Sequence, residues 1–258
     1  MFKDEFKAVC NSGLAKLTLL DNNPLGYFFS AMLAGIFVAI GAFTCFAAAT
    51  PLNTNDSPIT KIIMSVTFAV ALSLVIAAGS ELFTGNCFVL SAASFNKTIS
   101  WGGNLRVSLM GYLGNFIGAI IAVALFHASG VARGPIGEFF AASSAIKMAY
   151  PPIELITRAI FCNALVCFAV WCSIKLKSES AKLIMAFWCI FAFMICGFEH
   201  SIANMSLLAV GLLNAGAQSV SIGGYIYNLI LSTIGNIIGG ILFVALPYYM
   251  ISKNTSKK

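Results

Sequence analysis

The chain has 258 residues, of which 59% are hydrophobic and only 9% are charged, and its formal net charge is +6. A soluble domain has about 25% charged residues, so a chain with so few cannot cover a water-exposed surface. The composition therefore excludes an ordinary soluble enzyme, a disordered chain and a nucleic-acid-binding protein. It favours a protein that crosses a lipid bilayer several times.

The chain begins with a segment, residues 1–23, in which acidic residues lie among the lysines before any long apolar run. That pattern is unlike a cleaved signal peptide, and we expect an amphipathic segment on the cytoplasmic membrane surface. Apolar runs long enough to cross a bilayer as helices follow at 25–49, 61–94, 107–127, 153–174, 183–213 and 222–251. The polar or turn-rich segments between them are 51–58, 96–104, 128–152 and 175–180.

Lysine and arginine fall unevenly on the two sides of these spans. Eleven lie on the side of the two termini, and four lie on the other side: Lys61, Arg133, Lys147 and Arg158. Because positive residues collect in cytoplasmic loops, we predict a protein of the cytoplasmic membrane with both termini in the cytoplasm. The chain is then one membrane domain made of an N-terminal segment, a first half, an external loop, a second half and a tail: 1–23, 24–127, 128–152, 153–251 and 252–258.

The eight cysteines form no Cys-x-x-Cys pair, and most lie in or beside the apolar runs. We interpret them as small buried apolar residues. Their spacing favours neither a disulfide framework nor a metal site, and we expect no cofactor.

The second and fifth runs, 61–94 and 183–213, are longer than one crossing requires, and a polar stretch with glycine interrupts each of them. The two interruptions align at an offset of 118 residues, which superimposes Gly79, Glu81 and Asn86 on Gly197, Glu199 and Asn204. Residues 114–125 also align with residues 235–246, with eight of twelve positions identical. Two such matches in the same order indicate an internal duplication.

Each half has three spans, an odd number, so the second half enters the bilayer from the opposite side and the two repeats are inverted. In transporters with inverted repeats, helices broken at corresponding positions form the substrate site near the bilayer midplane. Non-helical backbone at that depth must be buried in protein or line a cavity. We therefore place the functional site between the two interruptions.

Glu81 and Glu199 are ionisable groups inside apolar sequence, where charge is costly. We interpret them mainly as acceptors for the free N–H groups at which each half-helix begins, with a proton relay as the alternative. His200 has Leu82 as its counterpart, so the duplication does not account for it, and its imidazole could donate a hydrogen bond or a proton to an anion. Thr84 offers a hydroxyl there, unless it bonds its own helix backbone.

Four further polar residues are candidates. Lys147 lies in the segment 128–152, among small residues that could re-enter the membrane or cap the mouth of a pore. Asn115 and Asn236 lie within their spans beside small residues, which favours hydrogen bonds between helices. Asn163 fits a place on a path or a packing role equally well.

The stretch 197–205, Gly-Phe-Glu-His-Ser-Ile-Ala-Asn-Met, closely resembles a signature of the formate/nitrite transporter family. Residues 81–86 and 234–240 resemble its other two signatures, and the likeness covers nearly the whole chain. The resemblance implies a homopentamer of protomers similar in fold to aquaporins, each with its own pore for small monovalent anions: formate, nitrite, lactate or, in one branch, hydrosulfide. The short connection between the fifth and sixth runs resembles the hydrosulfide branch, and the Asn-Pro-Ala pair of aquaporins is absent.

By this resemblance, His200 and Thr84 correspond to the family's central histidine and loop threonine, and Lys147 to the lysine that places positive charge near that histidine. Asn163 and Asn236 correspond to its pore asparagines. The resemblance implies an outer hydrophobic constriction at Leu82, Phe68 and Phe193 and an inner one at Leu72, Val166 and Ala203. The breaks that hold this site are attributed to Glu81, Glu199, Gly79, Gly197, Asn86 and Asn204.

The sequence thus predicts an all-α membrane protein with six transmembrane helices, the second and fifth broken, that forms a channel for small anions. A weak acid could also take up a proton and cross as a neutral molecule, so a proton-coupled carrier for formate or nitrite is the alternative. An intramembrane enzyme using Glu199 and His200 lacks a nucleophile or metal ligands beside that pair, and a water or glycerol channel is the other rival. Whether residues 1–23 gate the path stays open.

Overall fold

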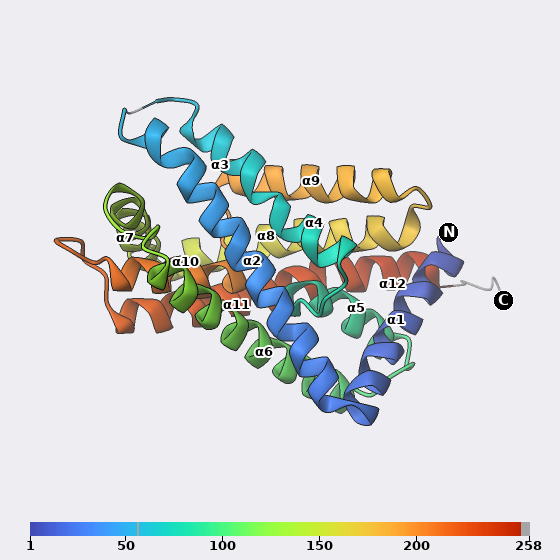
Figure 1. Ribbon diagram of the computed structural model, residues 1–258. Coiled ribbons are helices and arrows are strands. Elements are labelled where there is room, and N and C mark those ends of the chain that lie inside the picture. Colours follow the sequence, from blue (N-terminus) through green and yellow to red (C-terminus); the bar gives the residue numbers. More distant parts are fainter. Residues whose placement is uncertain (56, 254–258) are drawn as a thin grey trace.

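The structure is a computed structural model that describes residues 1–55 and 57–253. That part of the chain is all-helical (Figure 1). Its elements are α1 (Lys3–Asn22), α2 (Pro24–Asn53), α3 (Thr60–Phe68), α4 (Val70–Ala77), α5 (Phe83–Phe95), α6 (Trp101–Ala128), α7 (Pro135–Met148), α8 (Pro152–Lys175), α9 (Glu179–Cys196), α10 (Ser201–Leu213), α11 (Ile222–Gly240), the π-helical turn η1 (Ile241–Ala245) and α12 (Leu246–Ser252).

Six helical segments of the described chain are long and apolar enough to cross a membrane: Pro24–Asn53, Thr60–Ala77, Trp101–Ala128, Pro152–Lys175, Glu179–Cys196 and Ile222–Ser252. The number agrees with the sequence prediction, and the chain has the helices of a multi-pass membrane protein. Each of the two overlong runs resolves into one full-length segment followed by a short apolar helix, α5 or α10.

Several helices extend into segments that the sequence assigns to turns. The helix α2 continues through Pro51 to Asn53, because a proline in the last turn of a helix removes only one backbone donor. The helices α6 and α9 begin early because serines cap them: Ser100 accepts the Gly103 N–H and Ser178 accepts the Ala181 N–H. The long segment 128–152 contains a helix of its own, α7.

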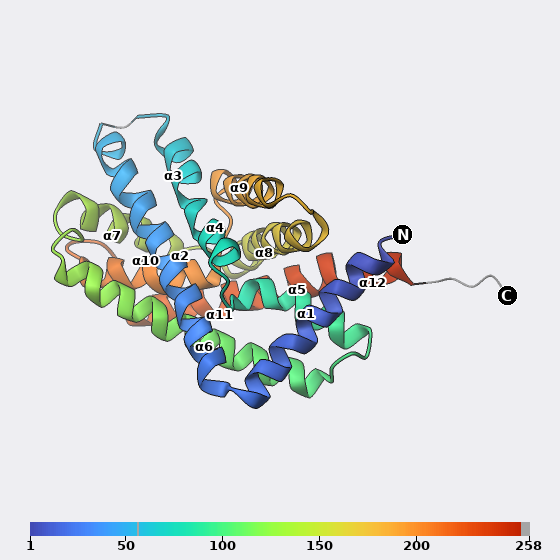
Figure 2. The same ribbon diagram turned by 45° about the vertical axis from the view of Figure 1, so that its right-hand side comes forward.

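The two ends of the molecule are marked by different helices. Figures 1 and 2 both show α1 and α12 at one end and α7 at the opposite end. We call these ends the α1 side and the α7 side. The short helix α5 packs against α1, whereas α10 packs against α7, so the two short helices belong to opposite sides.

The helix α1 is not simply a membrane-surface segment, because one of its faces is buried against protein. Phe6, Val9 and Cys10 are buried in a cluster with residues of α5. Burial raises the pKa of the Cys10 thiol to about 11, so Cys10 stays an uncharged, small side chain. All eight cysteines are free and six are buried, but Cys196 is exposed, contrary to the prediction of buried apolar residues.

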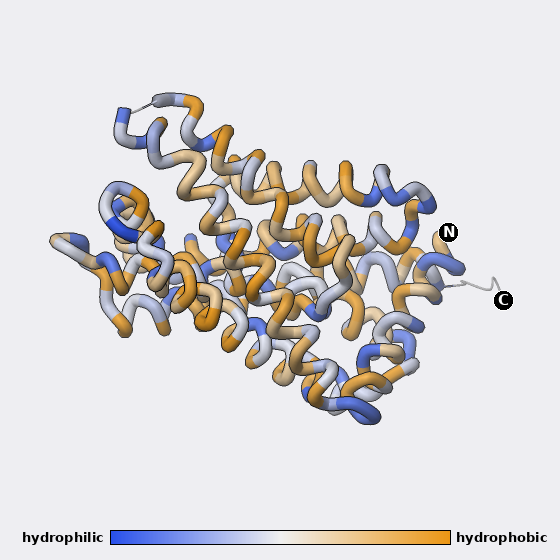
Figure 3. Tube along the Cα trace, in the orientation of Figure 1, coloured by the Kyte–Doolittle hydropathy of each residue, from blue (hydrophilic) through white to orange (hydrophobic). Residues whose placement is uncertain are grey.

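Apolar residues predominate along the long helices (Figure 3), and many large ones are exposed, as expected for helices in a bilayer. Large apolar residues at a spacing of four point outward on α6 and α11: Leu105, Leu109 and Leu113, and Ile226, Ile230 and Ile234. The same helices pack through glycines on their inner faces. A side chain at Gly118 would overlap the Met32 carbonyl of α2, and one at Gly239 would overlap the Ile160 carbonyl of α8, so these helix pairs meet backbone to backbone.

Candidate functional site

Two short non-helical stretches lie at the centre of the molecule, one between α4 and α5 and one between α9 and α10. Each contains a glycine in the left-handed region, Gly79 with φ 74° and Gly197 with φ 70°, a conformation that side chains other than glycine seldom adopt. We call these stretches the first break and the second break.

Asparagines from neighbouring helices satisfy the backbone at both breaks. The Phe83 N–H at the start of α5 donates to Asn115 Oδ1, and the Ser201 N–H at the start of α10 donates to Asn236 Oδ1, each at 2.9 Å. The amide nitrogen of each asparagine donates to two carbonyls, those of Ala31 and Glu81 for Asn115, and those of Ala159 and Glu199 for Asn236. The role that we expected of the glutamates, accepting these free N–H groups, therefore belongs to the asparagines.

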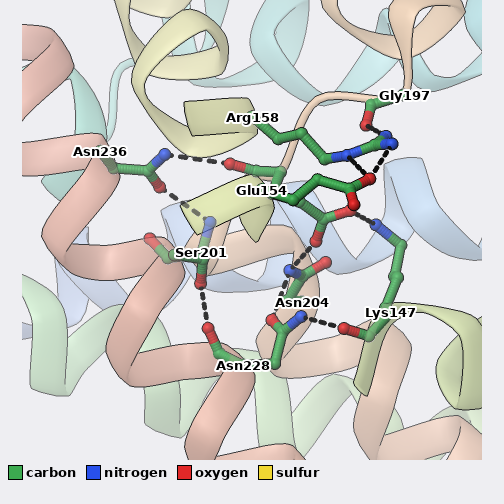
Figure 4. A network of polar contacts seen from close by, with 10 residues as sticks. Lys147, Glu154, Arg158, Gly197, Ser201, Asn204, Asn228 and Asn236 are labelled. Atoms are coloured by element: carbon green, nitrogen blue, oxygen red, sulfur yellow. Dashed lines mark hydrogen bonds and ion pairs between the residues drawn. The ribbon is translucent and has the colours of Figure 1, made fainter. Parts of the chain in front are cut away.

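The glutamate of the second break forms a buried ion pair with α7 (Figure 4). Lys147 Nζ lies 2.5 Å from Glu199 Oε1, and the Asn204 amide donates to Glu199 Oε2 at 2.7 Å. The Glu199 side chain is only 1% exposed. Asn204 also donates to Asn228 Oδ1, and the Asn228 amide donates to the Lys147 carbonyl, which ties α7 to α11.

The glutamate of the first break is paired in the same way from α1. Lys16 Nζ lies 2.6 and 2.7 Å from the two Glu81 carboxylate oxygens, and the Asn86 amide donates to Glu81 Oε2 at 3.0 Å. Asn86 also donates to the Tyr27 hydroxyl, which donates to the Val107 carbonyl. Neither Lys16 nor Tyr27 is among the site residues that the sequence predicts. The costly charge at Glu81 is the signal that could have indicated a lysine partner.

His200 and Thr84 meet across the two breaks. His200 is the N-cap of α10 and accepts the Ala203 N–H on Nδ1 at 3.0 Å, while its Nε2 lies 3.0 Å from Thr84 Oγ1 in the first turn of α5. Because Nδ1 accepts a hydrogen bond, a neutral imidazole carries its hydrogen on Nε2 and points it towards the threonine. The matching N-cap of α5 is Leu82, which makes no side-chain cap bond.

Three cavities are arranged around these residues. The α7-side cavity, of about 100 Å³, is lined by Lys147, Phe193, Phe198 and His200 among others. The α1-side cavity, of about 180 Å³, is lined by Lys16, Leu72, Ser80 and Leu82 among others. Between them, a central cavity of about 10 Å³ is lined by eight apolar residues and one polar residue, His200.

Five of the six residues expected to form hydrophobic constrictions line the central cavity: Phe68, Leu72, Leu82, Val166 and Phe193. The two expected groups of three are not separated as expected. Leu82, grouped with Phe68 and Phe193, also lines the α1-side cavity, whereas those two line the α7-side cavity. Ala203, grouped with Leu72 and Val166, lines the α7-side cavity, whereas Leu72 lines the α1-side cavity. The reason is that α5 and α10 begin at the centre and run to opposite sides, so the first turn of each faces its own cavity.

The two expected pore asparagines lie behind the lining. Neither Asn163 nor Asn236 is among the residues that line the three cavities, and Asn163 donates to the Asn236 carbonyl. Within residues 1–55 and 57–253, no three His, Cys, Asp or Glu side chains are grouped as a metal ion would require. The residues that line the three cavities offer charge, hydrogen bonding and apolar surface.

Comparison with known proteins gives the same result for sequence and structure. Residues 3–250 match the family model described as formate/nitrite transporter. The chain is 33% identical to the nitrite transporter NirC of Salmonella typhimurium, over 100% of this chain and 94% of that protein. It is 31% identical to the formate channel FocA of Escherichia coli strain K12, over 95% of this chain and 92% of that protein.

Two solved structures have a similar fold. An FNT family ion channel superimposes with a TM-score of 0.92 at 31% identity, covering 98% of this chain and 100% of that one. A pentameric formate channel with formate bound superimposes with a TM-score of 0.78 at 28% identity, covering 88% of this chain and 96% of that one. These relatives are transporters and channels, which confirms the prediction that the chain is not an enzyme.

Proposed function

Because the chain belongs to the formate/nitrite transporter family, we propose that it conducts small anions of weak acids, namely formate, nitrite and hydrosulfide, across the cytoplasmic membrane through the three cavities. One observation carries the proposal: the 3.0 Å contact between Nε2 of His200, the one polar residue that lines the central cavity, and Oγ1 of Thr84, which lies behind that lining. The nitrite transporter and the formate channel among its relatives support this substrate class.

The two lysines make each cavity attractive to an anion. Lys147 lines the α7-side cavity and Lys16 lines the α1-side cavity. An ammonium group has three hydrogens. Lys147 donates one of them to Glu199 and Lys16 donates two to Glu81, so two and one, respectively, remain for an anion that arrives in the cavity. An anion would therefore lose its water in the presence of positive charge.

The central cavity is the place where an anion would lose most of its hydration shell. About 10 Å³ is at the lower limit of the space that one water molecule needs. A bare charge among Phe68, Leu72 and Phe193 would lose its hydration without compensation, at a cost of several kcal/mol. His200 Nε2–H and the Thr84 hydroxyl are the donors that can replace part of the lost hydration shell. A weak acid has a second route, because it can take up a proton in the cavity and pass as a neutral molecule.

These two routes separate a channel from the alternative function, a proton-coupled carrier of formate or nitrite. The small apolar central cavity favours neutral passage, whereas the oriented Nε2–H favours an anion. Chloride cannot be neutralised at physiological pH, so it serves as the reporter of true anion passage. We keep the channel as the main proposal because the imidazole can donate to an anion without changing its own protonation.

We further propose the arrangement of the protein in the membrane. The matching bonds of Asn115 with Asn236 and of Glu81 with Glu199 support two inverted three-helix repeats in an aquaporin-like protomer. The similarity to a pentameric formate channel supports a homopentamer. The lysine and arginine bias supports cytoplasmic termini and hence a cytoplasmic α1 side.

The decisive experiment changes the central contact without removing the helix cap. In His200→Asn, the asparagine side chain can still accept the Ala203 N–H but offers no donor at the position of Nε2. Thr84→Val removes only the hydroxyl. Reconstituted in liposomes, both variants should lose flux of formate, nitrite and hydrosulfide by about tenfold or more, because a hydrogen bond to a charged group contributes about 1.5–3 kcal/mol.

Thr233→Val is the matched control, since the Thr233 hydroxyl contacts Tyr112, whereas the Thr84 hydroxyl contacts His200. Unchanged flux of every anion in both test variants would refute the proposal. Recording membrane current together with the internal pH of the liposomes separates the two modes. A channel gives current without acidification, whereas the carrier moves one proton with each anion.

A further inference from the structure

Two cations besides Lys147 lie at the outer rim of the α7-side cavity, beside the second break. A methyl group placed on Gly197 would lie 3.4 Å from Arg158 Nη1 and 3.9 Å from Lys61 Nζ, so both cations approach the same point. Arg158 Nη1 donates to the Gly197 carbonyl at 2.9 Å. Figure 4 shows Arg158, Gly197 and Lys147 together in this region.

Both cations lie beside residues that line the α7-side cavity. Lys61, Met64 and Phe68 follow one another on one stripe of α3, and the latter two line the cavity. Arg158 lines a neighbouring surface cavity of about 300 Å³ that shares Phe198 with the α7-side cavity. Lys61 is exposed and Arg158 is partly exposed, so both can meet an anion before it reaches Lys147.

The guanidinium of Arg158 has hydrogens to spare. Its Nε and Nη2 both donate to Glu154 Oε1, and one Nη1 hydrogen goes to Gly197. A guanidinium has five hydrogens, so one on Nη1 and one on Nη2 remain. The Lys61 ammonium adds three more. The rim therefore offers several charge-assisted donors within a small volume.

The charge balance beside the two cavities also differs. At the rim of the α7-side cavity, Lys61, Lys147 and Arg158 lie with Glu154 and Glu199, which leaves one positive charge in excess among these five residues. Beside the α1-side cavity, the Lys16–Glu81 pair is balanced, and the other lysines and arginines of that side do not line the cavity. Such an excess raises the local concentration of anions and the rate at which they are captured.

A purely structural role for the two cations is the competing explanation, because cations stabilise the C-terminal end of a helix such as α9. The first break shows that a break of this kind can form without cations beside its glycine. Gly79 has the same left-handed backbone as Gly197, yet a methyl group placed there would have no atom within 4 Å. The first break forms without a cation beside its glycine. Lys61 and Arg158 are therefore not required for the backbone of the second break and can bind an anion.

We propose that Lys61 and Arg158 form a recruitment site for planar oxyanions such as nitrite and formate at the α7-side rim, where the anion is captured before it moves to Lys147. The inference rests on the proposed function of the central path. A guanidinium places its N–H groups in one plane and matches the two oxygens of a planar anion, whereas hydrosulfide offers a single sulfur atom. The rim is therefore selective for oxyanions.

The test uses the full-length protein in right-side-out and inverted membrane vesicles, with nitrite, formate and hydrosulfide as probes. In Lys61→Gln at low ionic strength, the half-saturating concentration of nitrite presented to the α7 side should rise about two- to fivefold, while that on the α1 side and the maximal flux change much less. High salt should remove the difference. Arg133→Gln is the control, since it removes one positive charge from the loop before α7, and Arg133 is not among the residues that approach Gly197.

Arg158→Lys keeps the positive charge but removes the planar guanidinium group with its paired N–H donors. It should raise the half-saturating concentrations of nitrite and formate but leave that of hydrosulfide within twofold. The recruitment site is refuted if Lys61→Gln behaves like Arg133→Gln, or if Arg158→Lys affects all three anions equally. If the unmodified protein conducts the anions normally, either of these two results refutes the recruitment site alone and leaves the proposed function standing. If the unmodified protein conducts none of the anions, the proposed function itself is refuted.

Discussion

The two breaks are built on the same scaffold but present different chemistry to the path. Each has an asparagine that caps the short helix, a glutamate paired with a lysine, and a second asparagine on that glutamate. At the centre, however, the second break has His200 where the first has Leu82. The contacts that a broken helix needs in a membrane occur twice, and the side chain that we propose to bind the anion occurs once. The comparison thus separates scaffold from function.

The two ion pairs also differ in how firmly they are held. Glu199 is 1% exposed, and Asn228 ties both Asn204 and the Lys147 backbone to α11. Glu81 is 13% exposed, and the Tyr27 hydroxyl takes the place of the Asn228 amide without any contact to Lys16. We therefore expect the α7 side to be the more rigid of the two.

Removing the glutamates should give the largest difference between the breaks. Glu199→Ala removes the counter-charge of Lys147 at a position that is only 1% exposed, which we expect to cost about 3–5 kcal/mol of unfolding free energy. Glu81→Ala should cost about 1–3 kcal/mol, because the position of Glu81 is 13% exposed and water can replace the carboxylate beside Lys16. Thermal unfolding of the detergent-solubilised protein measures both. Equal losses of unfolding free energy in the two variants would show that the difference in exposure between the two glutamates does not affect stability.

The capping asparagines should be equivalent, which tests the shared scaffold. Asn236→Ala and Asn115→Ala each remove three hydrogen bonds of the same kind, and each should cost about 2–4 kcal/mol. Asn163→Ala removes a single bond to the Asn236 carbonyl and serves as the control, with a loss of about 1 kcal/mol. A clear inequality between the first two variants would contradict the common scaffold.

Exchanging the central residues tests whether the scaffold alone makes a site. In the double variant Leu82→His with His200→Leu, the new imidazole can cap α5, but the residue aligned with Thr84 is Ile202, which has no hydroxyl. Nitrite flux in liposomes should therefore stay about tenfold below that of the unmodified protein. Full recovery of flux would mean that any polar group at either break suffices.

The smallest effect is expected at the α1 side, from Lys16→Gln. The half-saturating nitrite concentration for transport from that side should rise about two- to fivefold, with little change from the α7 side. Lys7→Gln provides the comparison, since Lys7 lies on α1 but does not line the α1-side cavity. A rise on both sides would show that Lys16 acts on the fold instead of the local potential.

The sequence alone predicts the number of membrane-spanning helices, the positions of the two breaks and the central candidate residue. Apolar length predicts the six crossings because a bilayer requires about 20 apolar residues for each helix. The internal alignment locates both breaks, and the exception in that alignment, His200 opposite Leu82, identifies the central candidate. These inferences concern residues close together in sequence or repeated at a fixed offset, so no knowledge of packing is needed.

The partners of those residues depended on the tertiary structure. Lys16 resembles an ordinary surface lysine in sequence, and only the packing of α1 on α5 brings it to Glu81. The caps of α5 and α10 come from asparagines in other helices, and Leu82 and Ala203 face cavities on opposite sides because their helices diverge from the centre. The sequence by itself determined where charge and backbone polarity must be compensated within the membrane. Which distant side chain compensates them was decided by the tertiary structure, since hydrogen bonds and ion pairs require atoms about 3 Å apart.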